Sequence, residues 1–472
     1  MVKQKDLIIL GGGTGGYVAA IKAAQAGRQV TIIEKNKLGG TCLHNGCIPT
    51  KAMLKSAEVM EIANQSDNFG LEFNGELTLN YTKVLKRKES IINQLHQGVK
   101  ALMKKNKIEI IEGTGVVQGP SIFTPDSGGV AVTYNDESLE DEIFVPKNLI
   151  IATGSSPMTL PNLPIDEEQI LSSDGLLQLT ELPKSMAIVG GGVIGCEWAS
   201  ILSAFGVEVT VVEALDRLVP GESKKISKTL QRELEKRQVT VSLKQRVKDA
   251  EVTDKSVKLS FENSDKPIEV EKVLVSIGRK PNVQGIGLKN TSIKFDEKGI
   301  QVNDHYQTAE SHIYAIGDVI DTLQLAHVAM KEGELAVEHM TTGDSEPINY
   351  INVPRCTYTH PEIATVGYTK DSVPKDMDVE YGEFSLAGNG KSLIEDQKTK
   401  GFVQILRDKN TDDLVGLSII GPHATDLISE ASTAMYLNAT PIEIGEAIHA
   451  HPTISEAIAE AALDLDNLAI HK

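Results

Sequence analysis

The chain has 472 residues, enough for about three domains of ordinary size, and its 40% hydrophobic and 24% charged residues are typical of a globular protein with a full core. Its net charge of −18 argues against a nucleic-acid-binding surface and against attraction to anionic lipid. Only 4% of the residues are aromatic, so platforms for stacking bases are not expected.

The first residues do not read as a membrane span or as a signal peptide. Residues 7–21 form an uncharged run of 15 residues with five glycines, whereas a span needs about 20 mostly apolar residues. Lys3 and Lys5 before an apolar run could begin a signal peptide, but Asp6 interrupts that start. We therefore expect a cytoplasmic protein, in a compartment where structural disulfides are rare. Four cysteines then need another explanation: Cys42, Cys47, Cys196 and Cys356.

The first predicted unit is a strand, a glycine-rich turn, a helix and a second strand. Residues 7–10 are apolar and predict a buried strand, and residues 11–16 follow with the pattern G-x-G-x-x-G. Residues 17–26 predict a helix, and residues 29–33 predict a strand that Glu34 closes. This order is typical of a dinucleotide-binding unit.

Two cysteines follow soon afterwards, in residues 39–51. Cys42 and Cys47 are separated by four residues and could be buried free thiols, half of a metal site or a redox pair. A zinc site usually has a second pair of closely spaced ligands, and no other cysteines lie close together. Gly46 gives the backbone the freedom that bonding across so short a loop would need, and thiolates near a helix N-terminus are stabilised. The pattern favours the redox pair and leaves free thiols open.

The same strand, turn and helix recur in the middle of the chain. Residues 187–189 predict a strand, residues 190–195 repeat the G-x-G-x-x-G pattern, and residues 196–205 predict the helix. Residues 207–212 predict the next strand, which Glu213 closes. We therefore expect a second dinucleotide site.

The closing acid has the same spacing in both units. Glu34 lies 23 residues after Gly11, and Glu213 lies 23 residues after Gly190. In such units the glycines permit the tight turn, the approach of a pyrophosphate and the packing of helix on strand, and the acid binds ribose hydroxyls. An acid at Glu213 would repel a 2′-phosphate, which favours NAD over NADP.

A histidine near the C-terminus is the candidate base. Thiol–disulfide exchange needs a group that accepts and returns protons near neutral pH, which suits His451. Pro452 breaks the chain, so Glu456 could turn back toward the His451 ring and orient it. His449 has no acid at the same spacing, and we expect it to be structural.

Together these motifs resemble the class I pyridine nucleotide–disulfide oxidoreductases over essentially the whole chain. The resemblance rests on both glycine turns, the cysteine segment, residues 152–154, residues 278–282, residues 317–318 and the His-Pro-Thr at residues 451–453. Within the family it is greatest to members that oxidise dihydrolipoamide, on residues 39–51, 325–327, 358–362 and 449–456 and on Glu213. It implies an α/β fold with two Rossmann-like dinucleotide-binding domains, for FAD and NAD, and a C-terminal α+β dimerisation domain.

The resemblance also implies roles for single residues. Cys42 would exchange with substrate, Cys47 would face the flavin, and His451, oriented by Glu456, would be the base, donated by the other subunit of a homodimer. The residues expected at FAD are Gly11, Gly13, Gly16, Glu34, Lys51, Gly115, Asp318 and Ala326, with Gly154 also expected at a cofactor. Those expected at NAD are Gly190, Gly192, Gly195, Glu197, Glu213, Val247 and Gly278. No metal ligand is expected.

The implied activity is oxidation of protein-bound dihydrolipoamide to lipoamide with reduction of NAD⁺ to NADH. Dihydrolipoamide would open a Cys42–Cys47 disulfide through a mixed disulfide with Cys42, and electrons would pass from Cys47 by way of FAD to NAD⁺. The expected partners are a second copy of the chain, and the lipoyl domains and core acyltransferase of a 2-oxo acid dehydrogenase complex. The expected domains are FAD-binding at residues 1–150 and 278–347, NAD-binding at residues 151–277 and interface at residues 348–472.

The chain departs from the family pattern between the cysteines. His44 and Asn45 replace the commoner Asn-Val, and His44 is near enough in sequence to the thiols to alter their titration. The alternative activity is that of another NAD(P)H-dependent flavin disulfide reductase of the same family. A docking protein without catalysis is disfavoured because Cys42, Cys47 and His451 are all retained. Cys196 is expected to be a small core residue.

Overall fold

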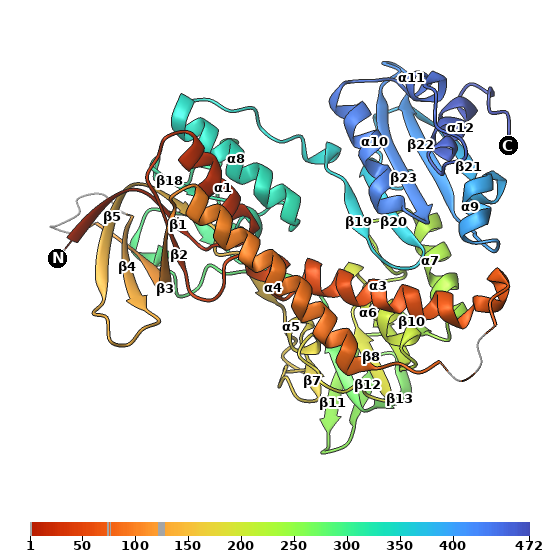
Figure 1. The fold of residues 1–472 in the computed structure, drawn as a ribbon, viewed down its shortest axis with the longest axis horizontal. Coiled ribbons are helices and arrows are strands. Elements are labelled where there is room, and N and C mark those ends of the chain that lie inside the picture. Colours follow the sequence, from red (N-terminus) through yellow and green to blue (C-terminus); the bar gives the residue numbers. More distant parts are fainter. Residues whose placement is uncertain (1, 73–74, 76, 121–127) are drawn as a thin grey trace. The chain divides into compact units, whose positions relative to one another are not determined.

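The computed structural model describes residues 2–72, 75, 77–120 and 128–472 (Figure 1). The chain divides into two compact units. The first unit comprises Met1–Ala52, Thr82–Met158 and Gly278–Ile348, and the second comprises Met53–Tyr81, Thr159–Ile277 and Asn349–Lys472. None of the described helices is long and apolar enough to cross a membrane.

The first unit is built on a mixed sheet whose parallel strands run in the order β3-β2-β1-β5-β18. Strand β4 joins β3 to β5 in antiparallel pairing. The strands are β1 (Val2–Leu10), β2 (Val30–Glu34), β3 (Glu109–Gln118), β4 (Gly129–Tyr134), β5 (Glu142–Ile151) and β18 (Ile313–Ala315). The helices are α1 (Thr14–Gln25), α2 (Gly40–His44), α4 (Tyr81–Lys105), α8 (Ala326–Thr342) and the start of α3 (Cys47–Asn64).

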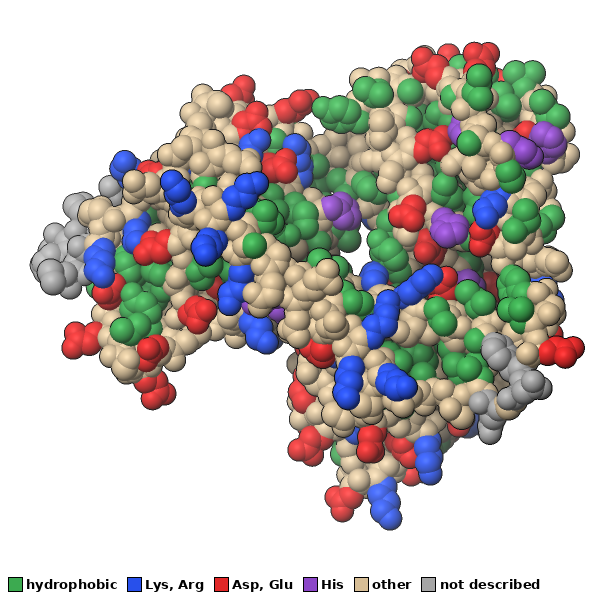
Figure 2. All heavy atoms as spheres, in the orientation of Figure 1, with side chains coloured by type: hydrophobic (Ala, Val, Ile, Leu, Met, Phe, Trp, Pro, Cys, Tyr) green, Lys and Arg blue, Asp and Glu red, His purple; other side chains and the backbone are tan. Residues whose placement is uncertain are grey.

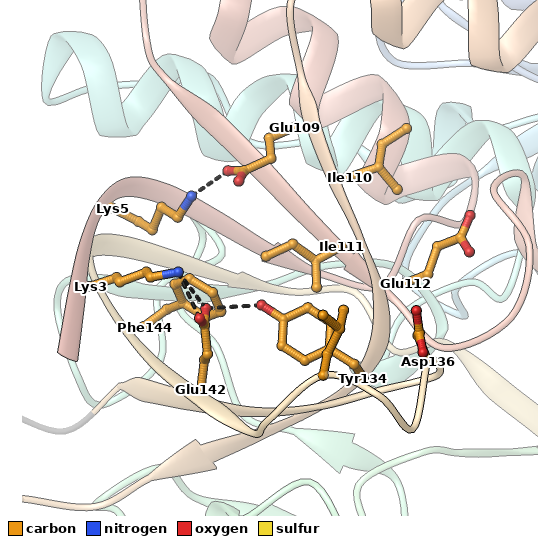
Figure 3. Close-up of a pocket in the computed structure, with 11 residues that line it drawn as sticks. Lys3, Lys5, Glu109, Ile110, Ile111, Glu112, Tyr134, Asp136, Glu142 and Phe144 are labelled. Atoms are coloured by element: carbon orange, nitrogen blue, oxygen red, sulfur yellow. Dashed lines mark hydrogen bonds and ion pairs between the residues drawn. The ribbon is translucent and has the colours of Figure 1, made fainter. Parts of the chain in front are cut away.

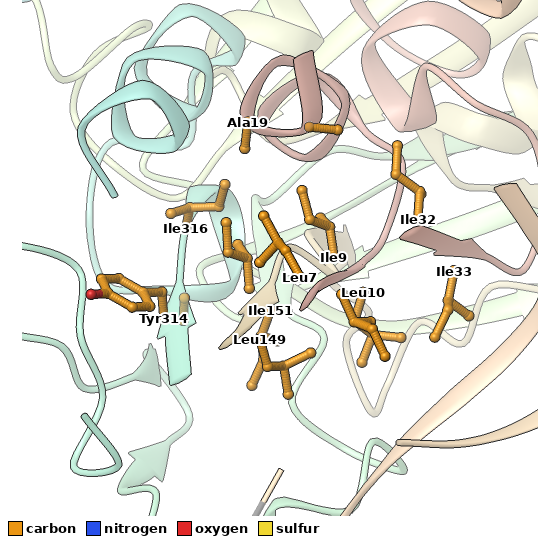
Figure 4. Close-up of a cluster of buried hydrophobic side chains, with 14 of the residues drawn as sticks. Leu7, Ile9, Leu10, Ala19, Ile32, Ile33, Leu149, Ile151, Tyr314 and Ile316 are labelled. Carbon is orange, nitrogen blue, oxygen red and sulfur yellow. The ribbon is translucent and has the colours of Figure 1, made fainter. Parts of the chain in front are cut away.

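The strands of the first unit contain uninterrupted runs of apolar residues because consecutive side chains are buried in its core. Side chains of β1, β2, β5 and β18 pack together in the buried cluster of Figure 4. Leu7, Ile8 and Ile9 are fully buried, as are Ile150 and Ile151. Parallel strands covered on both faces are apolar at consecutive positions, not only at alternate ones.

Helix α1 packs against α8 through two glycines. A Cβ at Gly15 would lie 2.9 Å from the carbonyl oxygen of Ala329, and one at Gly333 would lie 2.9 Å from the carbonyl oxygen of Gly15. The helices approach so closely that these positions leave little room for a side chain.

The second unit contains a parallel sheet in the order β10-β9-β8-β14-β7 and a small antiparallel sheet, β11-β12-β13. These strands are β7 (Ile170–Leu171), β8 (Ser185–Val189), β9 (Glu208–Glu213), β10 (Thr240–Leu243), β11 (Val247–Val252), β12 (Val257–Phe261), β13 (Ser264–Val270) and β14 (Lys272–Val275). Helix α6 (Val193–Ala204) follows β8, and α7 (Lys224–Lys236) follows β9. In α7, Ile226, Leu230 and Leu234 recur every four residues and are buried, while Ser223 caps the first turn by accepting from the Ile226 N–H.

The second unit also holds an antiparallel sheet in the order β19-β20-β23-β22-β21. Helix α10 packs on β20 and β23, and α12 packs on β21 and β22. The bounds are β19 (Arg355–Thr357), β20 (Glu362–Gly367), β21 (Val379–Ser385), β22 (Phe402–Asp408), β23 (Leu414–Gly421), α10 (Ala424–Tyr436), α11 (Pro441–Glu446) and α12 (Glu456–Asp464). The mixed sheet of the first unit, the parallel sheet of the second and this α+β part confirm the predicted fold class, whereas the three predicted domain boundaries stay a prediction.

Candidate active site

The first glycine turn connects β1 to α1. Gly11 has a φ of +107°, and a Cβ there would lie 2.3 Å from the carbonyl oxygen of Ala152. A Cβ at Gly16 would lie 2.0 Å from the carbonyl oxygen of Gly11. At Gly13 the nearest atom would be 4.0 Å away. The protein's own packing therefore requires Gly11 and Gly16, whereas Gly13 leaves open space before the helix.

The second turn, between β8 and α6, repeats this geometry. Gly190 has a φ of +112°, and its Cβ would lie 2.5 Å from the carbonyl oxygen of Ser276. A Cβ at Gly195 would lie 2.0 Å from the carbonyl oxygen of Gly190, but nothing lies within 4 Å of one at Gly192. Open space therefore occurs at Gly192, the second glycine of the G-x-G-x-x-G pattern, as it does at Gly13.

The two closing acids make matching hydrogen bonds. Glu34 Oε2 accepts from the backbone N–H of Gly12 at 2.7 Å, and Oε1 accepts from the amide two residues after Glu34 at 2.8 Å. Glu213 Oε2 accepts from the backbone N–H of Gly191 at 2.6 Å, and Oε1 from the amide two residues on at 2.7 Å. These bonds fix each carboxylate beside its glycine turn, and every oxygen keeps a lone pair for a ribose hydroxyl.

Both turns fit a dinucleotide. Gly13 and Gly192 are the N-caps of α1 and α6, and neither helix start receives a side-chain cap. Free backbone N–H groups at a helix N-terminus bind phosphate oxygens. The open space at Gly13 and at Gly192 lets a pyrophosphate approach. Each fixed acid suits the adjoining ribose. The residues present therefore fit FAD at one turn and NAD at the other.

Cys42 and Cys47 lie on either side of a break between two helices. Cys42 is in α2, Cys47 is the first residue of α3, and Gly46 lies at the break. The Cys42 thiol is hydrogen-bonded to Cys47. That hydrogen bond and burial raise the pKa of the Cys42 thiol, while the Lys51 ammonium opposes the rise. The two sulphurs are therefore neighbours, with a positive charge on the same helix as Cys47.

His451 is held by the carboxylate that the sequence predicts. The His451 Nδ1–H donates to Glu456 Oε1 at 2.8 Å, and the backbone N–H of Thr453 donates to Glu456 Oε2 at 2.8 Å. These contacts, with Thr453 the larger, lower the pKa of Glu456 below its usual range. With the proton on Nδ1, Nε2 is the ring nitrogen that can accept another, and the His451 side chain is 81% exposed.

The contacts of His449 agree with the structural role predicted for it, and they include a carboxylate partner. Its Nε2 bonds Glu430 Oε1 at 2.8 Å, and its Nδ1–H donates to the carbonyl oxygen of Ala447 at 2.9 Å. Glu430 lies on α10, so spacing along the sequence gives no sign of the pair. With only 11% of its side chain exposed, His449 anchors the start of the loop that carries His451.

Asp318 lies in a hydrogen-bonded cluster that the sequence reveals only in part. Its Oδ2 accepts from Ser155 Oγ at 2.6 Å, and Ser155 Oγ accepts from Arg279 Nε at 2.7 Å. The fully buried Glu332 accepts from the backbone N–H of Gly317 through Oε2 at 2.6 Å. Sequence reasoning missed Ser155 and Glu332, although a glutamate on the apolar face of a helix was an available signal for Glu332.

The other first-unit residues that are predicted to contact a cofactor differ in their packing and backbone conformation. Gly115 lies in β3, where a Cβ would be 2.5 Å from Leu10 Cδ1, so packing also requires glycine there. Gly154 and Gly278 have φ values of +68° and +123°. Ala326 is the first residue of α8. Gly278 was predicted at NAD, yet it belongs to the first unit.

In the second unit, Glu197 and Val247 are both buried. Glu197 lies on α6 and its Oε1 accepts from the backbone N–H of Tyr358 at 3.0 Å. Val247 begins β11, and its carbonyl oxygen accepts from Asn162 Nδ2 at 2.8 Å. Both cysteines of the predicted pair belong to the first unit, whereas His451 and Glu456 belong to the second.

Two other features carry no sign of a site. Cys196 is fully buried, and its thiol donates to the carbonyl oxygen of Gly191 at 3.4 Å, which confirms the predicted core position. A surface hollow of about 420 Å³ in the first unit is lined by apolar and charged side chains, and several of the charged groups pair with one another (Figure 3). Lys3 and Tyr134 both donate to Glu142, and Lys5 pairs with Glu109.

The chain is similar to known proteins in both sequence and structure. Residues 5–333 match the family described as pyridine nucleotide-disulphide oxidoreductase, and residues 353–462 match the dimerisation domain of the same family. A dihydrolipoyl dehydrogenase of Bacillus subtilis (strain 168) is 49% identical and covers 100% of both chains. The mitochondrial dihydrolipoyl dehydrogenase of Dictyostelium discoideum is 39% identical over 99% of this chain and 96% of its own. The crystal structure of LpdA from Mycobacterium tuberculosis has a TM-score of 0.89 at 26% identity, over 97% of this chain and 99% of its own.

Proposed function

Because this chain belongs to the pyridine nucleotide-disulphide oxidoreductase family, we propose that it is a flavoenzyme that oxidises protein-bound dihydrolipoamide to lipoamide and reduces NAD⁺. The observation that carries the proposal is the neighbouring thiol pair, Cys42 and Cys47, in the same unit as the first glycine turn. Relatives of full length that are named dihydrolipoyl dehydrogenase support this choice of substrate.

The substrate dithiol exchanges with a disulfide between Cys42 and Cys47. One substrate thiolate attacks Cys42 Sγ, so a mixed disulfide forms, the Cys42–Cys47 bond breaks and Cys47 leaves as a thiolate. The second substrate thiol loses its proton and attacks the first substrate sulphur, which closes lipoamide and releases Cys42 as a thiolate. Lys51 favours the thiolate form because its charge works against the rise in the pKa of Cys42.

His451 accepts the protons that the substrate thiols release. It does so through Nε2, while Glu456 holds Nδ1 and stabilises the imidazolium that results. FAD, when bound, supplies the two-electron chemistry between the reduced thiols and NAD⁺.

Two sets of residues hold the cofactors in this proposal. The FAD-binding domain comprises residues 1–150 and 278–347, and the NAD-binding domain comprises residues 151–277. Residues 348–472 form the interface domain. The FAD set is Gly11, Gly13, Gly16, Glu34, Lys51, Gly115, Asp318 and Ala326, and Gly154 is expected at a cofactor without assignment to either one. The NAD set is Gly190, Gly192, Gly195, Glu197, Glu213, Val247 and Gly278.

The working form in this proposal is a homodimer that serves a 2-oxo acid dehydrogenase complex through its lipoyl domains and core acyltransferase. The match to the family's dimerisation domain supports the dimer. Exposed hydrophobic side chains in the same part of the chain also support it. Figure 2 shows such side chains on the surface of the C-terminal region. Tyr436 at the end of α10, Leu437 after it and Ile448 after α11 are 81%, 69% and 102% exposed. The cytoplasmic location stays a prediction.

Anaerobic titration of the purified flavoprotein with dihydrolipoamide tests the function. We expect dihydrolipoamide to reduce the enzyme, and added NAD⁺ to reoxidise it with formation of NADH. Cys42→Ser should abolish this turnover and leave FAD bound. Reduction by NADH without any response to dihydrolipoamide would instead indicate a reductase for a different disulfide.

A further inference from the structure

Two histidines donate hydrogen bonds to one carbonyl oxygen beside the redox cysteines. His44 lies in α2, between Cys42 and Cys47, and its Nε2–H donates to the carbonyl oxygen of Leu38 at 2.9 Å. His96 lies on α4, and its Nδ1–H donates to the same oxygen at 3.0 Å. The rings meet edge to face, with their centres 5.1 Å apart. His96 thus connects α4 to the segment that enters α2.

Leu38 directly precedes the turn by which the chain enters α2. Leu38 is buried and precedes Gly39 and Gly40, whose φ values are +104° and +58°. The Gly39 N–H donates to the carbonyl oxygen of Gly12 at 2.8 Å, and a Cβ at Gly40 would lie 2.7 Å from Gly13 Cα. The carbonyl that both rings hold therefore belongs to a turn packed on the first glycine motif.

We propose that His44 and His96 are paired positioning residues that hold the Cys42 segment while at least one of the two rings is neutral, and release it when both are protonated. A neutral ring carries the one N–H that each bond needs. Two imidazolium rings 5.1 Å apart would repel each other, so one bond to Leu38 would be lost. The consequence for catalysis rests on the proposed function, in which Cys42 is the residue that exchanges with substrate.

The surroundings place this release on the acid side of neutrality. Burial lowers the pKa of His44, and His96 and Lys37 lower it further, while the Leu38 carbonyl and Glu34 oppose the shift. A folded state in which this pKa is lowered binds fewer protons than the unfolded chain. Because release requires both rings to be protonated, the hold is still complete at the ordinary histidine value of about 6.5 and is lost as the pH falls through the lowered pKa of His44.

Hydrogen–deuterium exchange of residues 38–50, measured by mass spectrometry on the oxidised holoenzyme between pH 5 and 8, tests the pair. After correction for the intrinsic pH dependence of exchange, we expect protection in the wild-type enzyme to fall about tenfold on acidification. In His44→Asn and in His96→Asn, protection at pH 8 should be lower than in the wild type. It should not fall further in a pH-dependent step on acidification. The double variant should behave like either single variant.

His471→Asn is the matched control, because His471 also bonds one partner through Nδ1, Glu460, but lies in the second unit. It should keep the wild-type step. A flat wild-type profile, or a wild-type step retained in either single variant, would overturn the proposal. If His96→Asn does not fold, His96→Gln serves in its place. Because no substrate is present, an enzyme that shows the step but does not oxidise dihydrolipoamide would refute the proposed function and leave the pair intact.

Discussion

Glu456 holds the His451 ring with one oxygen and the loop that carries it with the other. Glu456→Gln keeps the size of this side chain and removes its charge. We expect kcat for dihydrolipoamide oxidation to fall roughly 100-fold, because the imidazolium loses its counter-charge. Steady-state kinetics would measure this, and the KM for NAD⁺ should not change. An unaltered kcat would show that Glu456 does not assist the base.

The same carboxylate gives this loop a pH dependence of known sign. The Thr453 backbone N–H and the His451 ring lower the pKa of Glu456, so this group adds stability above the unfolded value of about 4.3. That contribution is lost as the pH falls through the lower, folded value. In wild type, exchange protection of residues 450–458 should therefore decrease only in strong acid. In Glu456→Gln it should already be reduced at pH 7.

The His449–Glu430 pair should matter for turnover without touching substrate. His449→Ala frees the start of the loop, so we expect kcat to fall roughly five- to tenfold with little change in KM. Glu430→Gln should produce a similar loss, and the double variant should lose no more than either single change, because both remove one interaction. Additive losses would mean that the two residues act separately.

Residues that act with a neighbour in sequence were predictable, and residues that act with a distant segment were not. The distance from each glycine turn to its acid led to Glu34 and Glu213, and His451 with Glu456 followed from five residues of spacing. Glu430 and Ser155 reach their partners across 19 and 163 positions of the chain. Such pairs depend on the folding of α10 and on the packing of β18 against β5, which a local pattern does not encode.

At the scale of elements, the helix starts show a consistent error. The sequence predicts helices from residues 17 and 196, but α1 begins at Thr14 and α6 at Val193. The last residues of each glycine turn are already helical, since Gly15 and Gly16 lie within α1 and Gly195 lies within α6. Strand β1 likewise begins at Val2, not at residue 7, since residues 2–5 pair in parallel with residues 143–146 of β5.

Two glycines of the second turn allow packing and ligand binding to be separated. A Cβ at Gly195 would lie 2.0 Å from the Gly190 carbonyl, so Gly195→Ala should force α6 away from β8 and lower Tm by several degrees. A Cβ at Gly192 meets nothing within 4 Å, so Gly192→Ala should leave Tm unchanged. Gly192→Ala should raise the KM for NAD⁺, because the added methyl occupies the space left for the pyrophosphate. Thermal unfolding and steady-state kinetics with NAD⁺ measure the Tm and the KM of both variants. An unaltered KM in Gly192→Ala would count against the predicted NAD site.

At the scale of the whole chain, the parallel strands next to each glycine turn could be predicted from the sequence, whereas the C-terminal sheet could not. Strands β1 and β8 each precede a glycine turn, and that motif identifies the α/β units. Residues 348–472 have no such marker, and their antiparallel strands pair across long intervals, as β20 does with β23. Only the resemblance to a family supplied that part of the fold.

Hybrid dimers give the most direct test of a shared active site. The match to the dimerisation domain, residues 353–462, contains His451 and Glu456, whereas Cys42 and Cys47 lie outside it. Consider a dimer that pairs a Cys42→Ser subunit with a His451→Gln subunit. If each site takes its base from the opposite subunit, one site has both defects and the other has none, so the hybrid should show about half of the wild-type activity.

If base and thiol act within one chain, both sites of the hybrid are damaged and it should be as inactive as the two parent homodimers. Co-expression with two different affinity tags, followed by sequential purification, isolates the hybrid for measurement of dihydrolipoamide oxidation. FAD content should equal that of the wild type in all three dimers, because neither substitution touches the glycine turn that FAD is proposed to occupy. Activity near half with full flavin would therefore assign the base to the opposite subunit, and a lack of activity with full flavin would assign it to the same one.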